Sequence, residues 1–546
     1  MVACPGKSAA LRFSCGGSIS GRFRRQTLQP QLGSRQFNQE YAFDASTKRD
    51  VLPLRHAPRN PPFNRGQPTS VRKKVLDAVS QAFQDFPAVV TIVLYLFLTG
   101  VTTMLLVLPA ASSSGSPTPL ADSSLTAASA IGVAGLSTLD MATHWSGFGH
   151  LVIFVAMQIG GLGVVTLATL LAVLASERLG RAMRNSFLGD YDPSYSEKNP
   201  RNSSLGVTVA DIGALLRVVV LSALVIQAVL TVFLVPILWR TGLDVWDGLW
   251  RGAYLATSAF TNTGFNPLVG GMAGLSDDPL FLLVLTAGSF LGSVGFSVIF
   301  VLSRALRTYF ERRRKRTIRR PRIGLHAQLT LTMSIGLLLA GAVVISALEW
   351  QNEATLGNQS AWMKPISAVF LSMMARSTGL NSIPTEELSS ASLLILDFLM
   401  FVGGGSASTA GGIKVTTLAV LLLAVYAQAR GNQDITVFER RIPSEIVRLA
   451  VTVTLWGATI VATTTILLMA ITPAPLEKAL FESISAFASC GLSAGFTNAE
   501  LPAAAKFILA ATIVIGRLGT ITFASALVGR RRTKLFRRAS ERPILG

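Results

Sequence analysis

Four short motifs along the chain share one ending: a small residue, a glycine and a bulky apolar residue. They are AIGVAGL at 130–136, AFTNTGF at 259–265, MARSTGL at 374–380 and AFASCGL at 486–492. Glycine permits backbone angles that turn carbonyl oxygens toward a common axis. A ring of such carbonyls can replace the water around an alkali cation without any ionised side chain. The motifs contain no Asp or Glu, which a pore for multivalent cations would show, so the pattern favours an alkali cation.

A short apolar segment precedes each motif and must position it. The segments cover 120–131, 244–260, 361–375 and 476–489, and they are too short to cross a bilayer but suit re-entrant helices. Such a helix points its C-terminal end, with partial negative charge, toward the membrane centre. A single glycine turn is common in ordinary loops and would indicate nothing further. Four turns in matched context predict a repeated unit of span, short helix, glycine turn and span.

A second stretch, within the apolar run 391–428, is too rich in glycine for a continuous helix. Its small and polar residues are Gly403, Gly404, Gly405, Ser406, Ser408, Thr409, Gly411, Gly412 and Lys414. Each glycine costs about 1 kcal/mol relative to alanine inside a helix, and broken backbone at membrane depth must line water or pack within protein. We therefore expect an intramembrane loop beside an aqueous path. A close-packed glycine seam between helices is the alternative. A phosphate-binding loop is excluded because Ile413 separates Gly412 from Lys414.

The composition is typical of a polytopic, all-α membrane protein. The 546 residues are 50% hydrophobic and 14% charged, and the mean hydropathy is +0.49. Eight apolar runs are long enough to cross a bilayer, the sixth being the glycine-interrupted one. They cover residues 86–108, 151–174, 212–238, 279–302, 329–348, 391–428, 446–471 and 507–528.

The net charge of +20 is unevenly distributed along the chain. Basic residues cluster at 72–74, 304–322 and 530–538, whereas the alternate loops are acidic. The positive-inside rule then places both termini in the cytosol. This distribution argues against nucleic-acid binding and predicts contact with anionic membrane lipid.

The sequence indicates no disulfide framework or resident metal. The three cysteines are Cys4, Cys15 and Cys490, and the four histidines form no metal-binding motif. Residues 1–80 are polar and basic, and we expect a disordered cytosolic tail. An organelle transit peptide is the alternative, although Glu40 and Asp44 argue against it.

Together these motifs resemble the Trk/Ktr/HKT superfamily of potassium transporters, and most closely its Ktr (KtrB-type) membrane subunits, over nearly all of residues 80–530. The resemblance implies four membrane–pore–membrane repeats around one pore. The repeats would cover 81–180, 205–308, 325–430 and 445–530, followed by a basic cytosolic tail at 531–546. Trk-type subunits carry two extra N-terminal spans, where this chain has its polar tail.

By the same resemblance, the motif glycines line an ion filter that holds K⁺. The matching residues are Gly135, Gly264, Gly379 and Gly491, preceded by Ala134, Thr263, Thr378 and Cys490. Glycine in the first filter position favours potassium, since plant relatives with serine there tend to favour sodium. The stretch 403–413 matches the loop that gates the path below the filter, with Ser-Ala at 406–407 where the family often has Pro-Gly.

Arg517 is expected to hold the gating loop. A charge at helix-centre depth costs at least about 2.5–3.5 kcal/mol and is usually functional. The family arginine at this position contacts the loop, so we expect Arg517 to donate hydrogen bonds to loop carbonyls and to add an electrostatic barrier. An ion pair with Asp397 is the alternative.

Further polar residues are expected to support the filter. Arg376 and Glu482 are expected to form a structural pair that braces it. Asn262, Asn266 and Asn381 flank filter glycines and are expected to bond the filter backbone or line the mouth.

The resemblance implies potassium uptake across the plasma membrane, driven by the ion gradient and by a potential worth about 2.3 kcal/mol per charge per 100 mV. A sodium-selective or sodium-coupled transporter of the same fold is the alternative. An enzyme is not indicated, because no nucleophiles, bases or metal ligands cluster. The resemblance also implies a homodimer and cytosolic nucleotide-binding (RCK/KtrA-type) regulatory subunits, for which 304–322 is a candidate docking surface. No cofactor is expected, with potassium as the substrate.

Overall fold

The computed structural model describes residues 87–163, 209–303, 305, 324–406, 408–432, 434–438 and 440–529. These residues belong to the second of the two units into which the chain divides, Met1–Gln67 and Pro68–Gly546. The predicted cytosolic tails, and the basic side chains of the clusters at 72–74, 304–322 and 530–538, lie outside the described residues.

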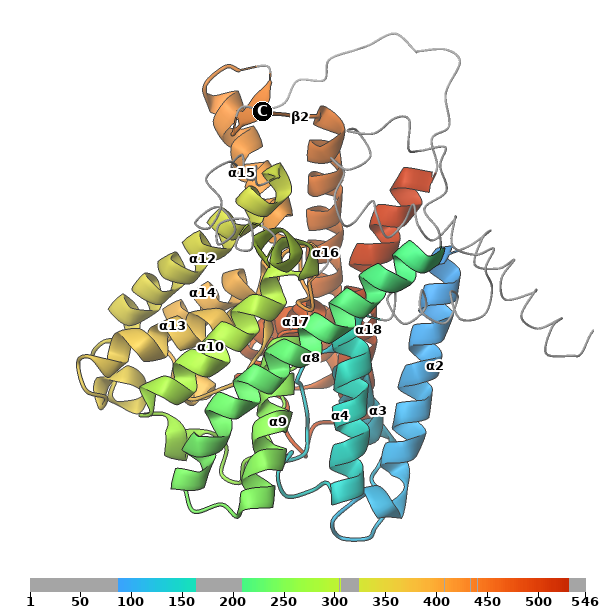
Figure 1. Ribbon diagram of the computed structural model, residues 1–546, viewed down its shortest axis with the longest axis vertical. Helices are drawn as coiled ribbons and strands as arrows, with labels where there is room; N and C mark the ends of the chain where they lie inside the picture. Colours follow the sequence, from blue (N-terminus) through green and yellow to red (C-terminus); the bar gives the residue numbers. More distant parts are fainter. Residues whose placement is uncertain are drawn as a thin grey trace, which may run out of the picture. The chain divides into compact units, whose positions relative to one another are not determined.

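The described chain is built almost entirely of helices and falls into four consecutive parts (Figure 1). The first part contains α2 (Pro87–Val107), α3 (Leu120–Gly132) and α4 (Gly147–Leu162), and the second contains α8 (Val209–Arg240), α9 (Val245–Thr261) and α10 (Pro279–Val294). The third contains α12 (Leu325–Glu349), α13 (Met363–Ser377), α14 (Ser390–Phe401) and α15 (Val415–Ala429). The fourth contains α16 (Ser444–Ile471), α17 (Leu476–Ala488) and α18 (Ala503–Gly529). Single turns of other helix types are η1 (Pro109–Ala111), η2 (Ala273–Leu275), η3 (Glu353–Gly357) and η4 (Thr385–Glu387).

The four short helices α3, α9, α13 and α17 lie at the predicted re-entrant segments, and their contacts form a closed cycle. Each packs against the helix before it and the helix after it in its own part. Each also packs against a helix of the preceding part: α9 against α4, α13 against α10, and α17 against α14. The cycle closes because α3, near the start of the described chain, packs against α18 at its end.

Capping residues define where several helices begin. Ser146 caps α4, Asp278 caps α10 and Ser389 caps α14, each through a side-chain oxygen that accepts from backbone N–H groups of the first turn. These N–H groups have no partner within the helix itself, so the caps stabilise the starting points.

Two predicted spans are interrupted. The span at 279–302 is not continuous: α10 ends before Gly295, whose φ is +94°, and the next helix, Phe296–Ser303, turns by 101°. A positive φ of this kind is open to glycine and strained for other residues. The glycine-rich run at 391–428 is divided into α14 and α15, as its composition predicts.

Three described helices are long and apolar enough to cross a membrane, namely Val219–Arg240, Leu325–Glu349 and Ser444–Ile471. The bent pair Pro279–Val294 and Phe296–Ser303 would be a fourth if it forms one span. Shorter apolar helices are Thr91–Val107, Gly147–Leu162, Ser390–Phe401 and Val415–Ala429. The total of eight spans stays a prediction.

One small sheet interrupts the helical fold of the described residues. Strand β1 (Ile435–Val437) pairs antiparallel with β2 (Arg440–Ile442) between α15 and α16, with Ile435 opposite Ile442. The expectation of a purely helical chain missed this hairpin, whose strands are only three residues long.

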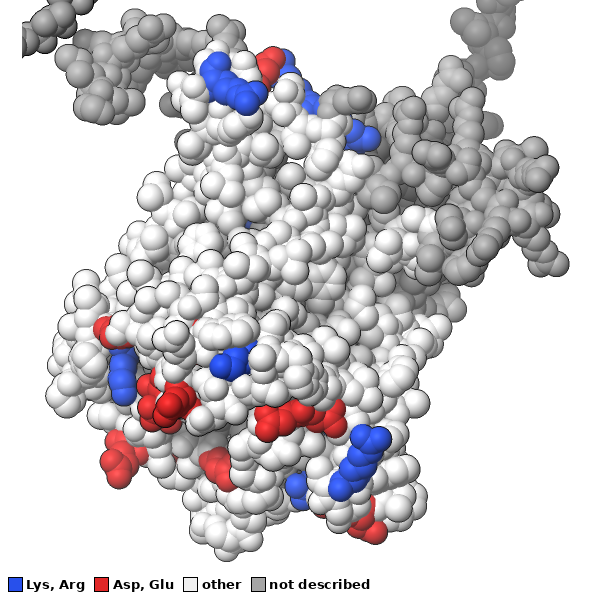
Figure 2. All heavy atoms as spheres, turned by 90° about the vertical axis from the view of Figure 1, so that its left-hand side faces the viewer, with Lys and Arg blue, Asp and Glu red and all other residues white. Residues whose placement is uncertain are grey.

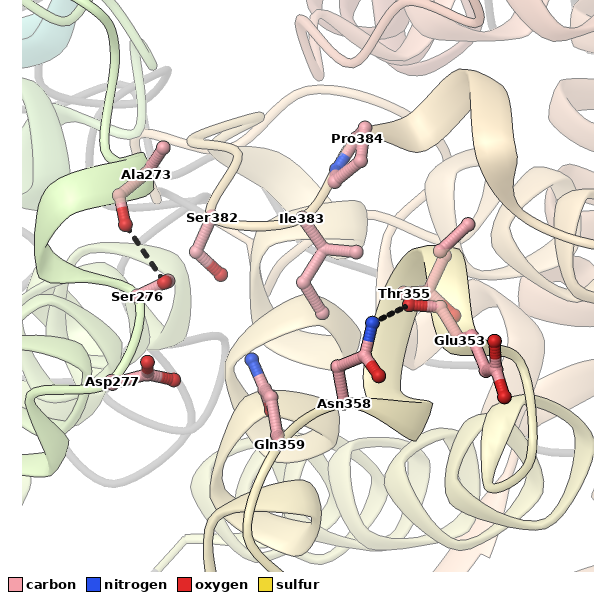
Figure 3. Close-up of a pocket in the computed structure, with 11 residues that line it drawn as sticks. Ala273, Ser276, Asp277, Glu353, Thr355, Asn358, Gln359, Ser382, Ile383 and Pro384 are labelled. Carbon is pink, nitrogen blue, oxygen red and sulfur yellow. Dashed lines mark hydrogen bonds between the residues drawn. The ribbon is translucent and has the colours of Figure 1, made fainter.

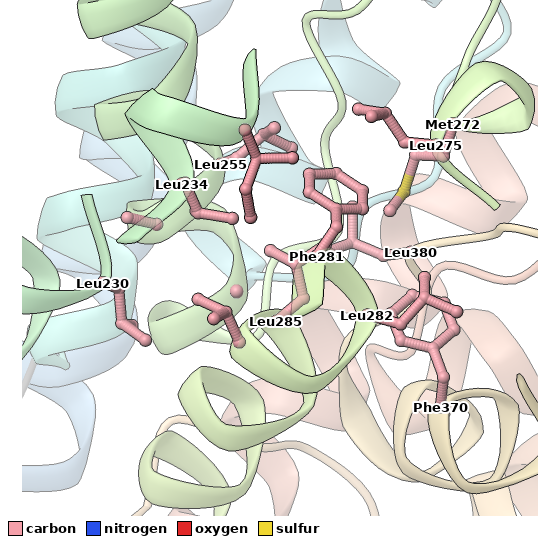
Figure 4. Packing of buried hydrophobic residues seen from close by; sticks show 14 of the residues in the cluster. Leu230, Leu234, Leu255, Met272, Leu275, Phe281, Leu282, Leu285, Phe370 and Leu380 are labelled. Atoms are coloured by element: carbon pink, nitrogen blue, oxygen red, sulfur yellow. The ribbon is translucent and has the colours of Figure 1, made fainter. Parts of the chain in front are cut away.

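A buried apolar cluster joins the second and third parts. Leu234 of α8, Leu255 of α9 and Phe281 of α10 pack in it together with Phe370 of α13 and Leu380 (Figure 4). Between helices in lipid, such packing stabilises mainly through dispersion, because lipid tails are as apolar as leucine. The cluster fixes the α10–α13 contact of the cycle.

Charged side chains lie mainly at the two ends of the face shown in Figure 2. Asp and Glu gather toward the lower end, where several Lys and Arg side chains lie among them, whereas Lys and Arg predominate at the upper end, where the hairpin lies (Figures 1 and 2). The broad belt between them carries almost no charge, which is typical of helices that face lipid.

Candidate functional site

The loops that follow the four short helices form a closed ring. Each motif glycine has a positive φ: +82° at Gly135, +88° at Gly264, +72° at Gly379 and +96° at Gly491. A Cβ atom added to any of them would lie under 3.0 Å from a backbone carbonyl oxygen of the next loop. The carbonyls that the four glycines face in turn belong to Thr263, Thr378, Cys490 and Ala134. The ring is closed because the last contact returns to the first loop.

Glycine is needed at these positions for two separate reasons. Its φ is in the left-handed range, and an added Cβ would overlap a neighbouring backbone carbonyl, so no side chain fits. The four residues that supply these carbonyls are fully buried. A ring of carbonyl oxygens without ionised side chains can coordinate an alkali cation stripped of its water.

The short helices reach the ring through two kinds of C-terminus. Val133, Asn262 and Ser489 adopt left-handed angles with φ of +57°, +59° and +51° at the ends of α3, α9 and α17. The next N–H in each loop then donates to a carbonyl five residues earlier, as in a Schellman motif. Helix α13 lacks such a residue and continues through Ser377.

A turn stabilised by one side chain follows each glycine. The second residue after the glycine is Ser137, Asn266, Asn381 or Ser493. In the first three loops its oxygen accepts from the N–H two residues further on, at 3.2, 3.0 and 3.0 Å. In the fourth, Ser493 Oγ accepts from the N–H of Thr497 at 3.3 Å.

The sequence predictions covered only half of this feature. Asn266 and Asn381 close local turns instead of bonding the ring backbone, because an N–H group two residues further along the chain is within reach. That they line the mouth stays a prediction. Ser137 and Ser493 were missed. The signal was present, since a serine or asparagine stands two residues after all four motif glycines.

The glycine-rich loop, residues 402–414 without residue 407, is a backbone structure closed on itself. The N–H of Gly403 donates to the Ile413 carbonyl at 2.9 Å, and the Ile413 N–H donates to the Phe401 carbonyl at 3.1 Å. The loop also contacts the broken end of α10: the Gly405 N–H donates to the Ser293 carbonyl at 2.8 Å. The break at Gly295 leaves that carbonyl without a partner in its own helix, so the loop completes the helix end.

The loop lies directly against the end of α17. A Cβ on Gly411 would overlap the Ala488 carbonyl, and a Cβ on Gly403 would overlap the Gly411 carbonyl. Ser408 Oγ donates to the Gly405 carbonyl at 2.6 Å, and Lys414 Nζ donates to the Ala410 carbonyl at 2.8 Å. The predicted loop residues are thus brought together in one compact segment between α10 and α17.

Arg517 of α18 ties this loop to another part of the chain. Its Nη1 donates to the Thr409 carbonyl at 2.6 Å, which is the kind of contact that the sequence predicts, and its Nη2 donates to the Gly160 carbonyl of α4 at 3.2 Å. Within the described residues Arg517 forms no ion pair with Asp397.

Asn262, the last residue of the second short helix, lies between the ring and the loop. Its fully buried amide lies 2.7 Å from Thr378 Oγ1 and 2.5 Å from Thr409 Oγ1. With the nitrogen toward Thr378, the amide donates to Thr378 and to the Ser289 carbonyl, and its oxygen accepts from Thr409. On the other side of α13, the Cys490 thiol donates to the Ala375 carbonyl at 3.1 Å.

The predicted pair of Arg376 and Glu482 is wrong. Both side chains are fully buried, but Arg376 donates to the carbonyl of Ser334 on α12 at 3.0 Å. Glu482 accepts instead from the hydroxyls of Ser493, at 2.7 Å, and Thr497. Each charge is held by neutral partners of its own part of the fold, although Arg376 Nε and Glu482 Oε2 are buried without a hydrogen-bond partner.

A buried ion pair that the sequence did not reveal joins the two ends of the described chain. Lys506 Nζ of α18 lies 2.6 Å from Asp122 Oδ1 of α3, and each side chain is 7% exposed. The Thr138 hydroxyl, three residues after Gly135, donates to the same carboxylate oxygen. The pair therefore holds the first loop of the ring against α18.

A polar pocket of about 300 Å³ lies beside the third post-glycine turn. Ser276 and Asp277 line one side of it, and Asn358, Gln359 and Ser382 line the other (Figure 3). None of the residues that the sequence predicts for filter or gate lines this pocket.

An apolar helical fold around a ring of backbone carbonyls defines the class: a membrane transport protein, not an enzyme. The chain belongs to the TrkH family of cation transport proteins, whose family model matches residues 76–531.

Individual relatives agree with this family. The chain is 33% identical over 427 residues to the Ktr system potassium uptake protein B of Vibrio alginolyticus, covering 78% of this chain and 87% of that protein. It is 29% identical over 428 residues to the potassium/sodium uptake protein NtpJ of Enterococcus hirae, covering 78% and 89%. The crystal structure of the potassium transporter TrkH from Vibrio parahaemolyticus matches with a TM-score of 0.60 at 16% identity, over 81% of this chain and 84% of that one. At that identity the match shows a shared helical fold.

Proposed function

We propose that this chain takes up potassium ions across the plasma membrane through the ring of backbone carbonyls. The observation that carries the proposal is the closed cycle in which each motif glycine lies against a carbonyl of the next loop. An entering alkali cation exchanges hydration water for these oxygens. The membrane potential drives it inward with about 2.3 kcal/mol per charge per 100 mV.

In this proposal the helices form four repeats of span, short helix and span around one pore. The cyclic contacts of the short helices, ending in the contact of α3 with α18, support this arrangement. The basic end of the molecule, near the hairpin, faces the cytosol with both chain termini, and the acidic end faces outward (Figure 2).

The glycine-rich loop is proposed as the gate. Its packing against the end of α17, which leads directly into the fourth ring loop, supports a position next to the ring. Arg517 holds the loop there through Thr409 and places a positive charge beside the path. Opening then requires this hydrogen bond to break or to move.

Potassium is favoured as the ion because the Vibrio alginolyticus relative is named a potassium uptake protein. Sodium transport or coupling is the second candidate, favoured by the naming of the Enterococcus hirae relative as a potassium/sodium uptake protein. We also propose a homodimer with cytosolic nucleotide-binding regulatory subunits. The designation of one relative as protein B of a Ktr system supports a membrane component that works with others.

Rubidium and sodium uptake into vesicles that hold the purified chain tests the proposal, with Gly264→Ser and Gly270→Ser alongside. Both glycines have a positive φ, but a Cβ at Gly270 meets nothing within 4 Å, so it controls for backbone strain alone. We expect rubidium flux above sodium flux in the unmodified chain and in Gly270→Ser, and loss of this preference in Gly264→Ser. Equal fluxes in the unmodified chain would overturn potassium as the substrate.

A further inference from the structure

One buried side chain connects the ring with the glycine-rich loop. The amide of Asn262 contacts Thr378, whose carbonyl faces Gly264 in the ring, and Thr409, whose carbonyl is held by Arg517. Asn262 and Thr378 are 0% exposed and Thr409 is 1% exposed. Buried hydrogen bonds of this kind are shielded from bulk solvent, so the position of each partner depends on the others.

We propose that Asn262 makes ion selectivity depend on the position of the loop. With the loop against α10 and α17, the Thr409 hydroxyl occupies the amide oxygen, and the amide nitrogen holds Thr378 in the geometry that the ring requires. When the loop moves away, the amide loses this partner and Thr378 loses a fixed neighbour. This inference rests on the proposed function of the ring as a filter and of the loop as its gate.

The surroundings leave Asn262 little freedom to find another arrangement. In the orientation that satisfies the amide, the oxygen also accepts from the Ser293 N–H at 3.1 Å and the nitrogen donates to the Ser289 carbonyl at 3.1 Å. Gly292 lies so close that an added Cβ would be 2.8 Å from the amide atom that meets Thr409, which is the oxygen in this orientation. The broken end of α10 therefore clamps Asn262 on one side while it binds the loop on the other.

Coupling of this kind acts in both directions. If loop position changes the affinity of the ring for potassium, potassium in the ring must favour the loop position seen here by the same factor. Asn262 is then a positioning residue for selectivity, although its side chain touches no ion.

The test compares hydroxyl deletions on the loop. Thr409→Val removes the hydroxyl that meets Asn262 and keeps the side-chain shape, whereas Ser408→Ala removes a hydroxyl that bonds only within the loop, to the Gly405 carbonyl. We expect Thr409→Val to lower the ratio of rubidium to sodium flux about tenfold, the effect of one buried hydrogen bond. We expect Ser408→Ala to alter the total flux without altering this ratio. Thr409→Ser keeps the hydroxyl and should retain the ratio of the unmodified chain.

A double-mutant cycle identifies the route. Asn262→Ala alone should lower the ratio as Thr409→Val does, and the double variant should lower it no further. If Asn262→Ala does not fold, Thr378→Val takes its place, because it removes the other hydroxyl that the amide meets. The inference would be overturned if the double variant lowered the flux ratio by the product of the two single effects. It would also be overturned if Thr409→Val left the ratio unchanged.

A binding measurement separates this inference from the proposed function. Potassium that binds the ring should raise the Tm of the detergent-purified chain more than sodium does, and Thr409→Val should reduce this difference. An unmodified chain with neither selective flux nor a potassium-dependent Tm overturns the proposed function. If the unmodified chain is selective and Thr409→Val has the same flux ratio and the same Tm difference, only the role of Asn262 is overturned.

Discussion

Arg517 shows how a single charge is held inside an apolar fold without an acidic partner among the described residues. Its guanidinium donates to the carbonyls of Thr409 and Gly160, from two segments far apart in sequence. Hydrogen bonds that involve a charged group are stronger than neutral ones, typically about 1.5–3 kcal/mol. The side chain therefore ties the loop in place and keeps its positive charge beside the proposed cation path.

Arg517→Gln should raise the cation flux about tenfold, since it removes the charge and weakens the hold on Thr409. Vesicle uptake measures this, with Arg251→Gln as the control. Arg251 pairs with Asp247 on the surface of α9, away from the loop, so its loss should leave the flux unchanged. Unchanged flux in a folded Arg517→Gln variant would reject the barrier.

The partners of buried charges were the least predictable feature of the site. Arg376 and Glu482 were expected to pair because both are charged residues near motif glycines. The sequence does not report the direction in which each side chain leaves its helix, and hydroxyls and carbonyls compete equally well for such groups. The Ser334 carbonyl and the hydroxyls of Ser493 and Thr497 are these competitors.

At the scale of elements, the break in α10 and the glycine-rich loop depend on each other. The loop N–H groups bond carbonyls that the broken helix leaves free, and glycine at 411 allows the loop to lie on the end of α17. Gly411 therefore determines how closely the proposed gate approaches the ring.

Gly411→Ala should push the loop away from α17 and raise the cation flux roughly tenfold, because overpacking costs about 1–3 kcal/mol. Gly336→Ala is the matched control: Gly336 lies in α12 with nothing within 4 Å of an added Cβ. That variant should keep its flux. A flux in Gly411→Ala at or below that of the unmodified chain would contradict a gating role for the packed loop.

The elements were predictable to the degree that local composition determines them. The four short helices, the four glycine turns and the division of the run at 391–428 follow from apolar length and glycine content. The break at Gly295 was not predicted, because glycines spaced through an apolar run, here at 288, 292 and 295, are also compatible with an intact helix. The hairpin between α15 and α16 is too short to give a periodic pattern.

For the whole molecule, ring closure depends on contacts between the first and last parts of the described chain. Asp122 of α3 and Lys506 of α18 form a buried pair at this seam, and Thr138 bonds the same carboxylate. Residues so distant in sequence meet only because the four parts are arranged in a cycle, so the pair could not be inferred from local pattern.

Lys506→Met should lower the free energy of unfolding by about 3–5 kcal/mol, because it leaves a buried carboxylate without its cation. Adding Asp122→Asn should recover part of the loss. Arg441→Gln breaks the exposed pair with Asp434 and should change the free energy by less than about 1 kcal/mol. Unfolding followed in detergent measures all three, and equal small effects would mean that the seam contributes little to stability.

The central claim is that the four loops form one cation site, and rubidium located in the structure tests it most directly. Anomalous scattering from crystals grown with rubidium should show an ion inside the ring of carbonyls from Ala134, Thr263, Thr378 and Cys490. The same ion should be absent in Gly264→Ser, where the added side chain displaces the Thr378 carbonyl. A ring without rubidium at saturating concentration, or rubidium bound only elsewhere, would contradict the account.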